Sequence, residues 1–339
     1  MINRELIRLK VVQLVYSYYQ NEGKTLEVAE KELAFSLNKA YELYLYLLSM
    51  LVKMKRVAEH KDAVRVAREK RTGNAVRGIS AANKFANNKF LEQLAENKQL
   101  IDYQENRKGD WSDEDNFIKT LYTTFVESDV FQNYISKEDF SYEADREVIR
   151  KLYKTHVCEN YDFDPLLEEH SLYWNDDKEV IDSFVLKTIK RFNEQSTAEQ
   201  PLLPPYADDE DRQFAENLFR SALERGGEMR DLIRRSSKNW EFERLAFMDV
   251  IIMQIALTEI LTFDTIPLNV TFNEYLDIAK VYSTPRSSSY INGMLEGIMR
   301  KLTREGRTTK VRIVRPRKSN SQVRDFYVRE GQYTEFQLD

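Results

Sequence analysis

The sequence predicts an all-α protein. It contains only 10 Gly and 7 Pro in 339 residues, so few positions interrupt a helix. Apolar residues recur three and four positions apart along most of the chain, whereas the alternation typical of strands is scarce. Hydrophobic residues make up 42% of the chain, which is enough to bury a sizeable core.

The first predicted helix runs from about Asn3 to Gln20. Arg4 and Arg8 stand four residues apart on one face of it. A stripe on another face is predicted to be buried and contains Ile7, Val11, Leu14 and Tyr18. A second helix is expected over about 25–59, and its tyrosine-rich run favours a place in the core. The basic stretch beyond it, up to residue 89, is poorly patterned and is predicted to be a mobile loop.

Helical patterns resume near Ser112 and continue to about Asn193. The segment that follows, 196–207, contains Pro201, Pro204 and Pro205 and is predicted to be a non-helical linker. Beyond it, Gly226 and Gly227 are expected to end one helix. A nearly all-apolar helix is predicted as the core, and it is marked by Trp240, Phe242, Leu245, Asp249, Ile252, Ala256 and Ile260.

Two further helices are expected near the C-terminus. Thr271 and Glu274 have the spacing of a capping box at the start of the first, which would end near Tyr282. Ser287 or Ser288 is predicted to cap the second, which would reach about Leu302. The basic sequence 309–318 alternates apolar and charged residues, which is typical of a short strand or an extended arm.

Opposite charges are segregated along the chain, although the net charge is only −5. Basic residues dominate 53–89 and the tail after Arg300, and acidic residues dominate 110–182. Such blocks indicate contact with a polyanion or docking of one part of the chain on another.

Several functional classes are not supported by the sequence. The N-terminus lacks the pattern of a signal peptide, and no apolar run is long enough to span a membrane. One cysteine, Cys158, suits a reducing cytoplasm. The three histidines, His60, His156 and His170, lack the spacing of zinc ligands. No nucleotide-binding or nucleophile motif is present, so we expect no catalytic residue, metal or cofactor.

The C-terminal motifs resemble those of the NusB family of transcription antitermination factors. The pattern IP-x-x-V-x-x-NE-x-x-x-x-AK is followed by an aromatic residue and NG-x-L. These positions are Ile266, Pro267, Val270, Asn273, Glu274, Ala279, Lys280, Tyr290, Asn292, Gly293 and Leu295. The sequences of 211–224 and 12–20 also resemble helices of this family.

The resemblance predicts a NusB-like helical bundle that is split by a long helical insertion and carries a basic extended C-terminal tail. The expected parts are the first helix at 1–22, the insertion at 23–195, the linker at 196–207, the main helical domain at 208–302 and the tail at 303–339. It also implies a function without catalysis. The family binds boxA-like single-stranded RNA together with NusE, a small-subunit ribosomal protein, and acts with other Nus factors in the elongation complex on ribosomal RNA operons.

The resemblance also implies where RNA would bind. The family uses its basic first helix and the loop that enters its last helix. The corresponding positions here are Arg4, Arg8, Lys10, Tyr16, Arg286, Ser287, Ser288, Ser289, Tyr290 and Asn292. Arginine and serine would hold phosphates at a helix N-terminus, Tyr290 would stack on a base, and Asn292 would bond to a base edge.

Other interpretations remain open at this stage. Tyr290 would pack against the first helix if it were purely structural, and Gly293 is expected to allow two helices to cross closely. The whole protein would be an interaction scaffold if its RNA contact were weak and non-specific. The acidic insertion would be an autoinhibitory lid if it covered the basic RNA-binding face.

Overall fold

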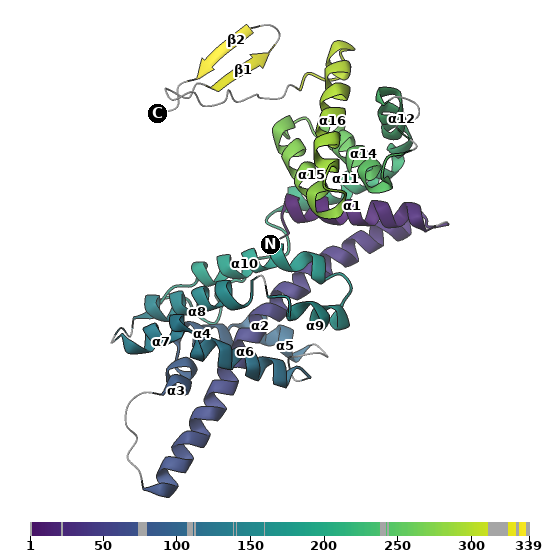
Figure 1. Cartoon of the computed structure of the whole chain (residues 1–339). Helices are drawn as coiled ribbons and strands as arrows, with labels where there is room; N and C mark the ends of the chain where they lie inside the picture. The colour runs from purple at the N-terminus through teal and green to yellow at the C-terminus, as the bar shows by residue number, and fades with distance from the viewer. Residues whose placement is uncertain are drawn as a thin grey trace. The chain divides into compact units, whose positions relative to one another are not determined.

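The structure is a computed structural model in which helices predominate (Figure 1). It describes residues 2–21, 23–73, 80–106, 111, 113–137, 139, 141–158, 160–237, 242 and 244–310, and the backbone of 325–329 and 332–336. The chain forms two compact units. Unit 1 comprises Met1–Ile2 and Ser36–Ala207, and unit 2 comprises Asn3–Phe35 and Asp208–Asp339.

Unit 2 is a bundle built around one buried helix, α14 (Phe247–Thr262). Every residue of α14 from Asp249 to Ile260 is buried, as expected for a core helix. Trp240, predicted to lie in this helix, is outside the described residues. Helix α14 packs against α1, α11, α12, α15 and α16. The bounds of these helices are α1 (Arg4–Gln20), α11 (Asp209–Glu224), α12 (Gly226–Ser236), α15 (Leu268–Tyr282) and α16 (Ser287–Arg304).

The predicted first helix is confirmed as α1. Asn3 is its N-cap, and the Asn3 side chain accepts a hydrogen bond from the backbone N–H of Leu6 at 2.9 Å. Residues 6 to 12, Leu14 and Val15 are all buried. The buried surface of α1 is therefore wider than the predicted stripe and includes Arg8.

Two predicted helix starts near the C-terminus were wrong. Helix α15 begins at Leu268, directly after Pro267, so Thr271 lies one turn inside the helix instead of capping it. A proline has its φ angle fixed near the helical value and ends the preceding loop, which explains the earlier start. Helix α16 begins at Ser287 itself, with Arg286 at the N-cap and no side-chain cap.

The predicted break at the glycine pair is confirmed. Helix α11 ends at Glu224 and α12 begins at Gly226. A Cβ atom at Gly226 would fall against the Tyr19 hydroxyl and within 2.7 Å of Nε2 of Gln254, whereas one at Gly227 would meet nothing within 4 Å. Gly226 is thus required by close packing between α12, α1 and α14.

Unit 1 is organised along helix α2 (Leu26–Thr72), whose first ten residues belong to unit 2. The helix is 47 residues long, so it continues beyond the predicted end near Glu59, and the predicted mobile loop was wrong over residues 60–72. The remaining elements are α3 (Ala81–Ala86), α4 (Lys89–Ala95), α5 (Lys98–Glu105), α6 (Asp115–Glu127), α7 (Asp129–Ser136), α8 (Tyr142–His156), α9 (Phe163–His170), the 3₁₀ turn η1 (Asn175–Asp177) and α10 (Lys178–Arg191).

The small helices α3, α4 and α5 of unit 1 each begin at a polar side chain that caps the helix. Ser80, Asn88 and Asn97 each accept the N–H of the residue three positions later, at the starts of α3, α4 and α5. These helices have only six to eight residues, too few for a clear apolar period. The sequence 80–89 was therefore predicted as part of a mobile loop, although Ala81–Ala86 forms α3.

The proline-rich segment is non-helical, as predicted, but it packs as part of unit 1. Leu202 and Leu203 are buried. The Asn97 side-chain amide donates to the carbonyl of Gln200 at 2.7 Å, and the Gln99 side chain accepts the N–H of Leu202 at 2.7 Å. The segment is therefore held at its backbone by neighbouring side chains rather than being an open linker.

The boundary between the units differs from the expected one. The expected boundary lay at residues 22–23, whereas the structure divides the chain at Phe35, inside α2. The predicted strand or arm at 309–318 lies outside the described residues from 311 onward. Further along the tail, β1 (Asp325–Arg329) and β2 (Gln332–Phe336) form an antiparallel pair in which Tyr327 lies opposite Thr334.

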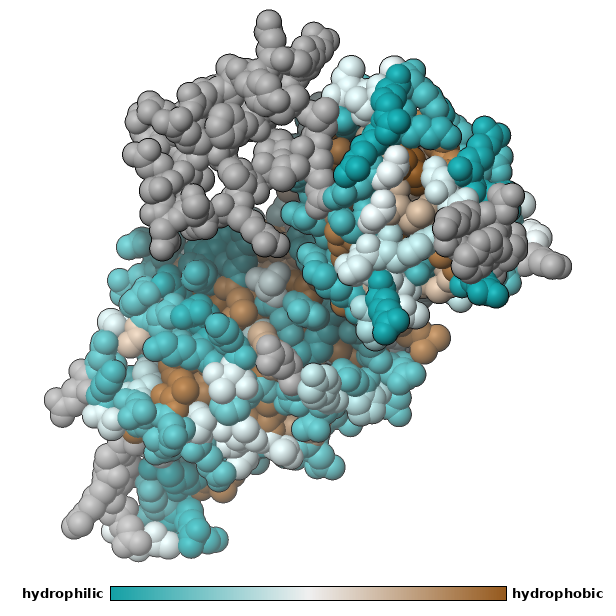
Figure 2. All heavy atoms as spheres, turned by 45° about the horizontal axis from the view of Figure 1, so that its top comes forward, coloured by the Kyte–Doolittle hydropathy of each residue, from teal (hydrophilic) through white to brown (hydrophobic). Residues whose placement is uncertain are grey.

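The surface in view is mainly hydrophilic (Figure 2). Hydrophobic residues on it occur in small groups between charged and polar ones. None of the helices in the described part of the chain is long and apolar enough to cross a membrane.

Candidate nucleic-acid interface

The loop between α15 and α16 is held by a buried carboxylate at the start of α14. Asp249 accepts hydrogen bonds from the hydroxyls of Ser283 and Ser287, the latter at 2.8 Å. The Ser287 hydroxyl also lies 2.7 Å from that of Thr284, and the backbone N–H of Ser287 donates to the Thr284 carbonyl at 2.9 Å. This network fixes the path of the chain into α16.

The residues after this anchor are open to solvent to different degrees. Arg286 and Ser289 are exposed, whereas Ser288, Tyr290 and Asn292 are half-buried. Asn292 Nδ2 lies 3.4 Å from Oε1 of Glu296, one turn further along the helix. These five predicted RNA-binding residues are thus grouped at the N-terminal end of α16.

Ser287 and Gly293 differ from the expectations for this loop. Ser287 is only 2% exposed, so the structure does not present its side chain to RNA at the surface. Its hydroxyl instead anchors the loop to α14. Gly293 is exposed, and a Cβ atom there would meet nothing within 4 Å. The expected close helix crossing at Gly293 is therefore absent.

Helix α1 brings Tyr16 to the same end of unit 2 as this loop. The Tyr16 ring lies 5.5 Å from the ring of Phe247, the first residue of α14. One turn earlier in α1, Gln13 Nε2 donates to the Tyr282 hydroxyl at 3.3 Å, directly before the loop. Tyr16 is half-buried, so part of its ring remains accessible beside the α15–α16 loop.

Arg8 lies elsewhere, in a buried network between α1, α14 and α15. Its Nε is 2.8 Å from Oε2 of Glu259, and its Nη2 is 3.0 Å from Oε1. Glu259 also accepts from Thr271 at 2.7 Å and from the Tyr275 hydroxyl at 3.0 Å. The Arg8 side chain is 3% exposed, so the structure does not present it to RNA at the surface.

Burial shapes the protonation of this network. Although desolvation lowers the pKa of Arg8, its hydrogen bonds and charge interaction with Glu259 raise it overall. Burial raises the pKa of Tyr275 well above its ordinary value, and the negative charge of Glu259 raises it further. Arg8 therefore stays charged and Tyr275 stays neutral, which keeps the network bonded.

Lys10 and Arg4, the other two predicted RNA-binding cations of α1, also interact with groups of the protein itself. Lys10 is 1% exposed and has a polar or electrostatic interaction, so the structure does not place it on the surface as predicted. Arg4 is partly exposed. Its Nε lies 3.0 Å from Oδ1 of Asp211, and its guanidinium sits 5.0 Å from the centre of the Phe214 ring.

The predicted residues therefore separate into two groups. The α16 residues and Tyr16 lie at the N-terminal end of α14. Arg4 and Arg8 lie near Glu259, about 15 Å further along that helix at 1.5 Å per residue. Sequence reasoning did not assign roles to Asp249 and Glu259. The sequence did contain a clue to both roles, because each residue is a carboxylate in a nearly all-apolar helix. A buried charge requires a polar or charged partner.

The described residues contain no group of three or more histidine, cysteine or acidic side chains that would hold a metal ion. Unit 2 combines an all-helical bundle, a buried arginine–glutamate network and an exposed helix entry with arginine, serine and tyrosine. This arrangement presents polar side chains at the ends of helices, as a binding domain does.

Comparisons with known proteins identify this domain. Residues 180–300 match the NusB family, and the match begins in α10 of unit 1. The transcription antitermination protein NusB of Salinibacter ruber is 39% identical over 133 residues, which are 37% of this chain and 82% of that protein. The Geobacter sulfurreducens protein of the same name is 40% identical over 95 residues, covering 28% of this chain and 69% of that protein. No solved structure matches. The chain belongs to the NusB family.

Proposed function

We propose that this protein is a transcription antitermination factor without catalytic activity that works in the cytoplasm. It binds boxA-like single-stranded RNA together with NusE and acts with other Nus factors in the elongation complex on ribosomal RNA operons. Membership of the NusB family and the names of the relatives, which are transcription antitermination proteins, support the antitermination role. The RNA, the partner and the operons follow from the family resemblance.

The entry to α16 is the observation that carries the proposed RNA site. Arg286 and Ser289 are exposed at the start of an 18-residue helix, where backbone N–H groups and the helix dipole favour phosphate. Tyr290 and Tyr16 present partly accessible rings at the same end of the domain. Base stacking on such a ring contributes about 1–3 kcal/mol. Asn292 would bond to a base edge.

Arg4 and Arg8 have different proposed roles. Arg4 is partly exposed and its partner Asp211 belongs to a neighbouring helix, so a phosphate would compete with a surface ion pair worth about 0–1 kcal/mol. Arg8 acts as a positioning residue, because its network holds α1 against α14 and α15. Lys10 has no proposed contact with RNA.

An interaction scaffold with weak, non-specific RNA contact is the second candidate. The observation that favours it is the burial of Arg8, Lys10 and Ser287, three of the expected RNA contacts. The half-exposed state of Tyr290 favours the RNA-binding function instead.

RNA titration distinguishes the two functions. Binding of a boxA-like strand and a scrambled strand is measured at two salt concentrations, with and without NusE. Arg286→Ala and Tyr290→Ala are compared with Arg300→Ala, which removes an exposed, ion-paired arginine at the other end of α16. We expect selective, NusE-dependent binding that falls in the first two variants and not in the third. Equal, purely salt-dependent binding of both strands would exclude the antitermination site and leave the scaffold.

A further inference from the structure

The last turns of α2 in unit 1 carry a face rich in cations. Arg56, Arg68, Lys70 and Arg71 are exposed. We call these four residues the cationic face. Among the described residues, none of the four forms an ion pair with a carboxylate, and Arg56 only approaches the side-chain oxygen of Gln104 at 3.5 Å.

Helical geometry places the four cations on one side. At 3.6 residues per turn they fall within about 160° of the circumference of α2. Ala63 and Ala67 are exposed on the same side, so small side chains separate the cations. From Arg56 to Arg71 the face extends about 22 Å at 1.5 Å per residue.

The acids of this part of α2 already have partners. Asp62 and Glu69 lie on the other side of the helix, and Glu59 lies at the edge of the cationic face, about 20° from Lys70. Asp62 accepts from the Asn83 side chain at 2.9 Å and from Ser80 at 3.1 Å, and it pairs with Arg65. Glu69 also pairs with Arg65, and Glu59 pairs with Lys55. These three carboxylates are therefore paired with cations within unit 1, whereas no carboxylate among the described residues pairs with the cationic face.

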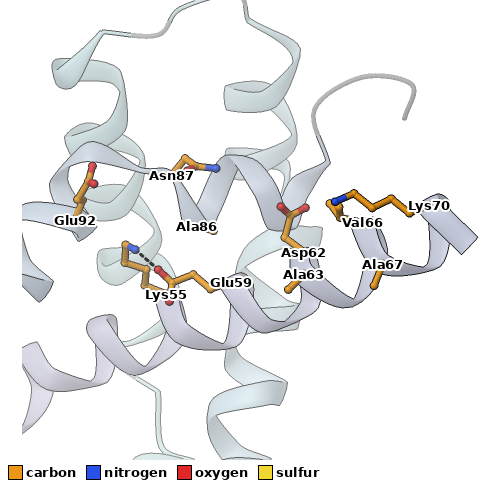
Figure 3. A pocket seen from close by; sticks show the side chains of 10 residues that line it. All are labelled: Lys55, Glu59, Asp62, Ala63, Val66, Ala67, Lys70, Ala86, Asn87 and Glu92. Carbon is orange, nitrogen blue, oxygen red and sulfur yellow. Dashed lines mark hydrogen bonds and ion pairs between the residues drawn. The ribbon is translucent and has the colours of Figure 1, made fainter. Parts of the chain in front are cut away.

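The groove between α2 and the helices α3 and α4 does not compete as an anion site. It has a volume of about 580 Å³, and its lining includes Glu59, Asp62 and Glu92 (Figure 3). Figure 3 shows the Lys55–Glu59 ion pair in this groove and Lys70 reaching along its far end. Of the two lysines that line this groove, Lys55 is paired with Glu59, and Lys70 belongs to the cationic face. The carboxylate of Glu92 adds a negative charge, which does not favour a phosphate there.

Stabilisation of α2 itself does not account for the face. Cations near a helix C-terminus interact favourably with the helix dipole, and Lys70 and Arg71 lie in the last turn. The effect falls off within one turn, so it does not apply to Arg56, which lies 16 residues before Thr72. An unneutralised, one-sided row of arginine and lysine is the electrostatic pattern of a nucleic-acid backbone contact.

We propose that the cationic face of α2 is a second RNA-binding surface, which contacts phosphates of the transcript outside the segment bound by unit 2. This inference rests on the proposed function, since it takes RNA as the ligand. Arginine suits the role because its planar guanidinium donates two hydrogen bonds to one phosphate. The contact would carry no sequence preference, because phosphates are the same at every base.

The salt dependence of RNA binding tests the proposal. The triple variant R56Q/R68Q/R71Q is titrated with a boxA-like RNA that carries an unstructured flank. The control K98Q/K119Q/R150Q removes three unit 1 cations that are paired with acids. Each phosphate contact on a single strand contributes about 0.7 to the slope of log K against log salt. We expect the slope to fall by about 2 in the triple variant and by clearly less in the control.

Further measurements distinguish RNA binding by the cationic face from loss of folding and from binding of an acidic protein. R56K/R68K/R71K keeps the charges and should keep the slope, and circular dichroism checks that all variants remain helical. An unchanged slope in the glutamine variant would overturn the proposal. So would equally tight binding of polyglutamate to the wild-type cationic face, which would indicate an acidic protein as the partner. Preference for boxA-like over scrambled RNA reports on unit 2, so its loss alone would contradict the proposed function and leave this surface standing.

Discussion

Arg8 of α1 and Glu259 of α14 lie 251 positions apart in the sequence and form a buried, bidentate ion pair. Glu274 adds a second carboxylate, 3.4 Å from Nη1 of Arg8. Buried charges are costly to desolvate and are tolerated only when they are paired and hydrogen-bonded. The pair therefore specifies how the N-terminal helix joins the C-terminal bundle.

Removing Arg8 alone should strongly destabilise unit 2. Arg8→Met leaves the carboxylate of Glu259 buried without its cation, and we expect a loss of about 3–5 kcal/mol in the free energy of unfolding. Urea denaturation measures the loss. Arg4→Met, at the partly exposed pair with Asp211, is the control and should cost about 1 kcal/mol or less. The double variant R8M/E259M should recover part of the loss, and no recovery would contradict the pairing argument.

The two adjacent glycines should respond differently to alanine. In Gly226→Ala the new Cβ atom collides with Tyr19 and Gln254, so we expect a loss of about 1–3 kcal/mol. Gly227→Ala meets no atom and lies in the first turn of α12, so it should be neutral or slightly stabilising. Melting temperatures of the two variants make the comparison. Equal effects would show that Gly226 is not needed for packing.

Asp249 should matter for RNA binding without touching RNA. Asp249→Ala removes the acceptor of the Ser283 and Ser287 hydroxyls, which loosens the entry to α16. Each hydrogen bond to a charged group contributes about 1.5–3 kcal/mol to holding the loop in this conformation. If RNA binds only this conformation, the loss of one such bond lowers the RNA affinity at least about tenfold. Asp277→Ala, at an exposed pair with Lys280, is the control. Unchanged affinity in Asp249→Ala would mean that the loop needs no anchor.

Alkaline pH should weaken unit 1 through Tyr44. Burial raises the pKa of Tyr44 from 10 to about 12, even though its hydrogen bonds with Thr188 and Leu203 act in the opposite direction. The unfolded chain therefore ionises first as pH rises. Stability is fully present below pH 10 and is lost between pH 10 and about 12, with about 1 kcal/mol lost by pH 11.

Denaturation at pH 9 and pH 11, followed by tryptophan fluorescence, measures this loss. Tyr44→Phe should be less stable at both pH values, because its hydrogen bonds are gone, but its loss between them should be smaller by about 1 kcal/mol. Tyr161→Phe, at an exposed site, should keep the wild-type loss. The same pH dependence in Tyr44→Phe and the wild type would assign the alkaline effect to other groups.

The sequence was most informative where one pattern spans many residues. The apolar period of α1 and the continuous apolar run of α14 predicted both helices, and the glycine pair predicted the break after α11. The 47-residue length of α2 was missed because residues 60–72 are rich in charge and none of them is buried. Short capped helices such as α4 gave too few periods to detect.

The candidate site could be predicted only in part, for a physical reason. A sequence shows that an arginine is present but not whether a distant carboxylate has already neutralised it. Arg286 and Arg8 look alike in the sequence, yet one is exposed and the other is paired with Glu259 inside the bundle. Carboxylates in apolar helices were the available clue, because each requires a buried donor.

The separation of Arg8 and Glu259 in the sequence has a consequence during synthesis. Ribosomes add about 5–20 residues per second, so Glu259 follows Arg8 by about 13–50 seconds. Residues 36–207 are contiguous and complete in that interval, while α1 still lacks the helices that bury it. Unit 1 is therefore able to fold on the ribosome first, and unit 2 closes only after α14 and α15 have left the exit tunnel.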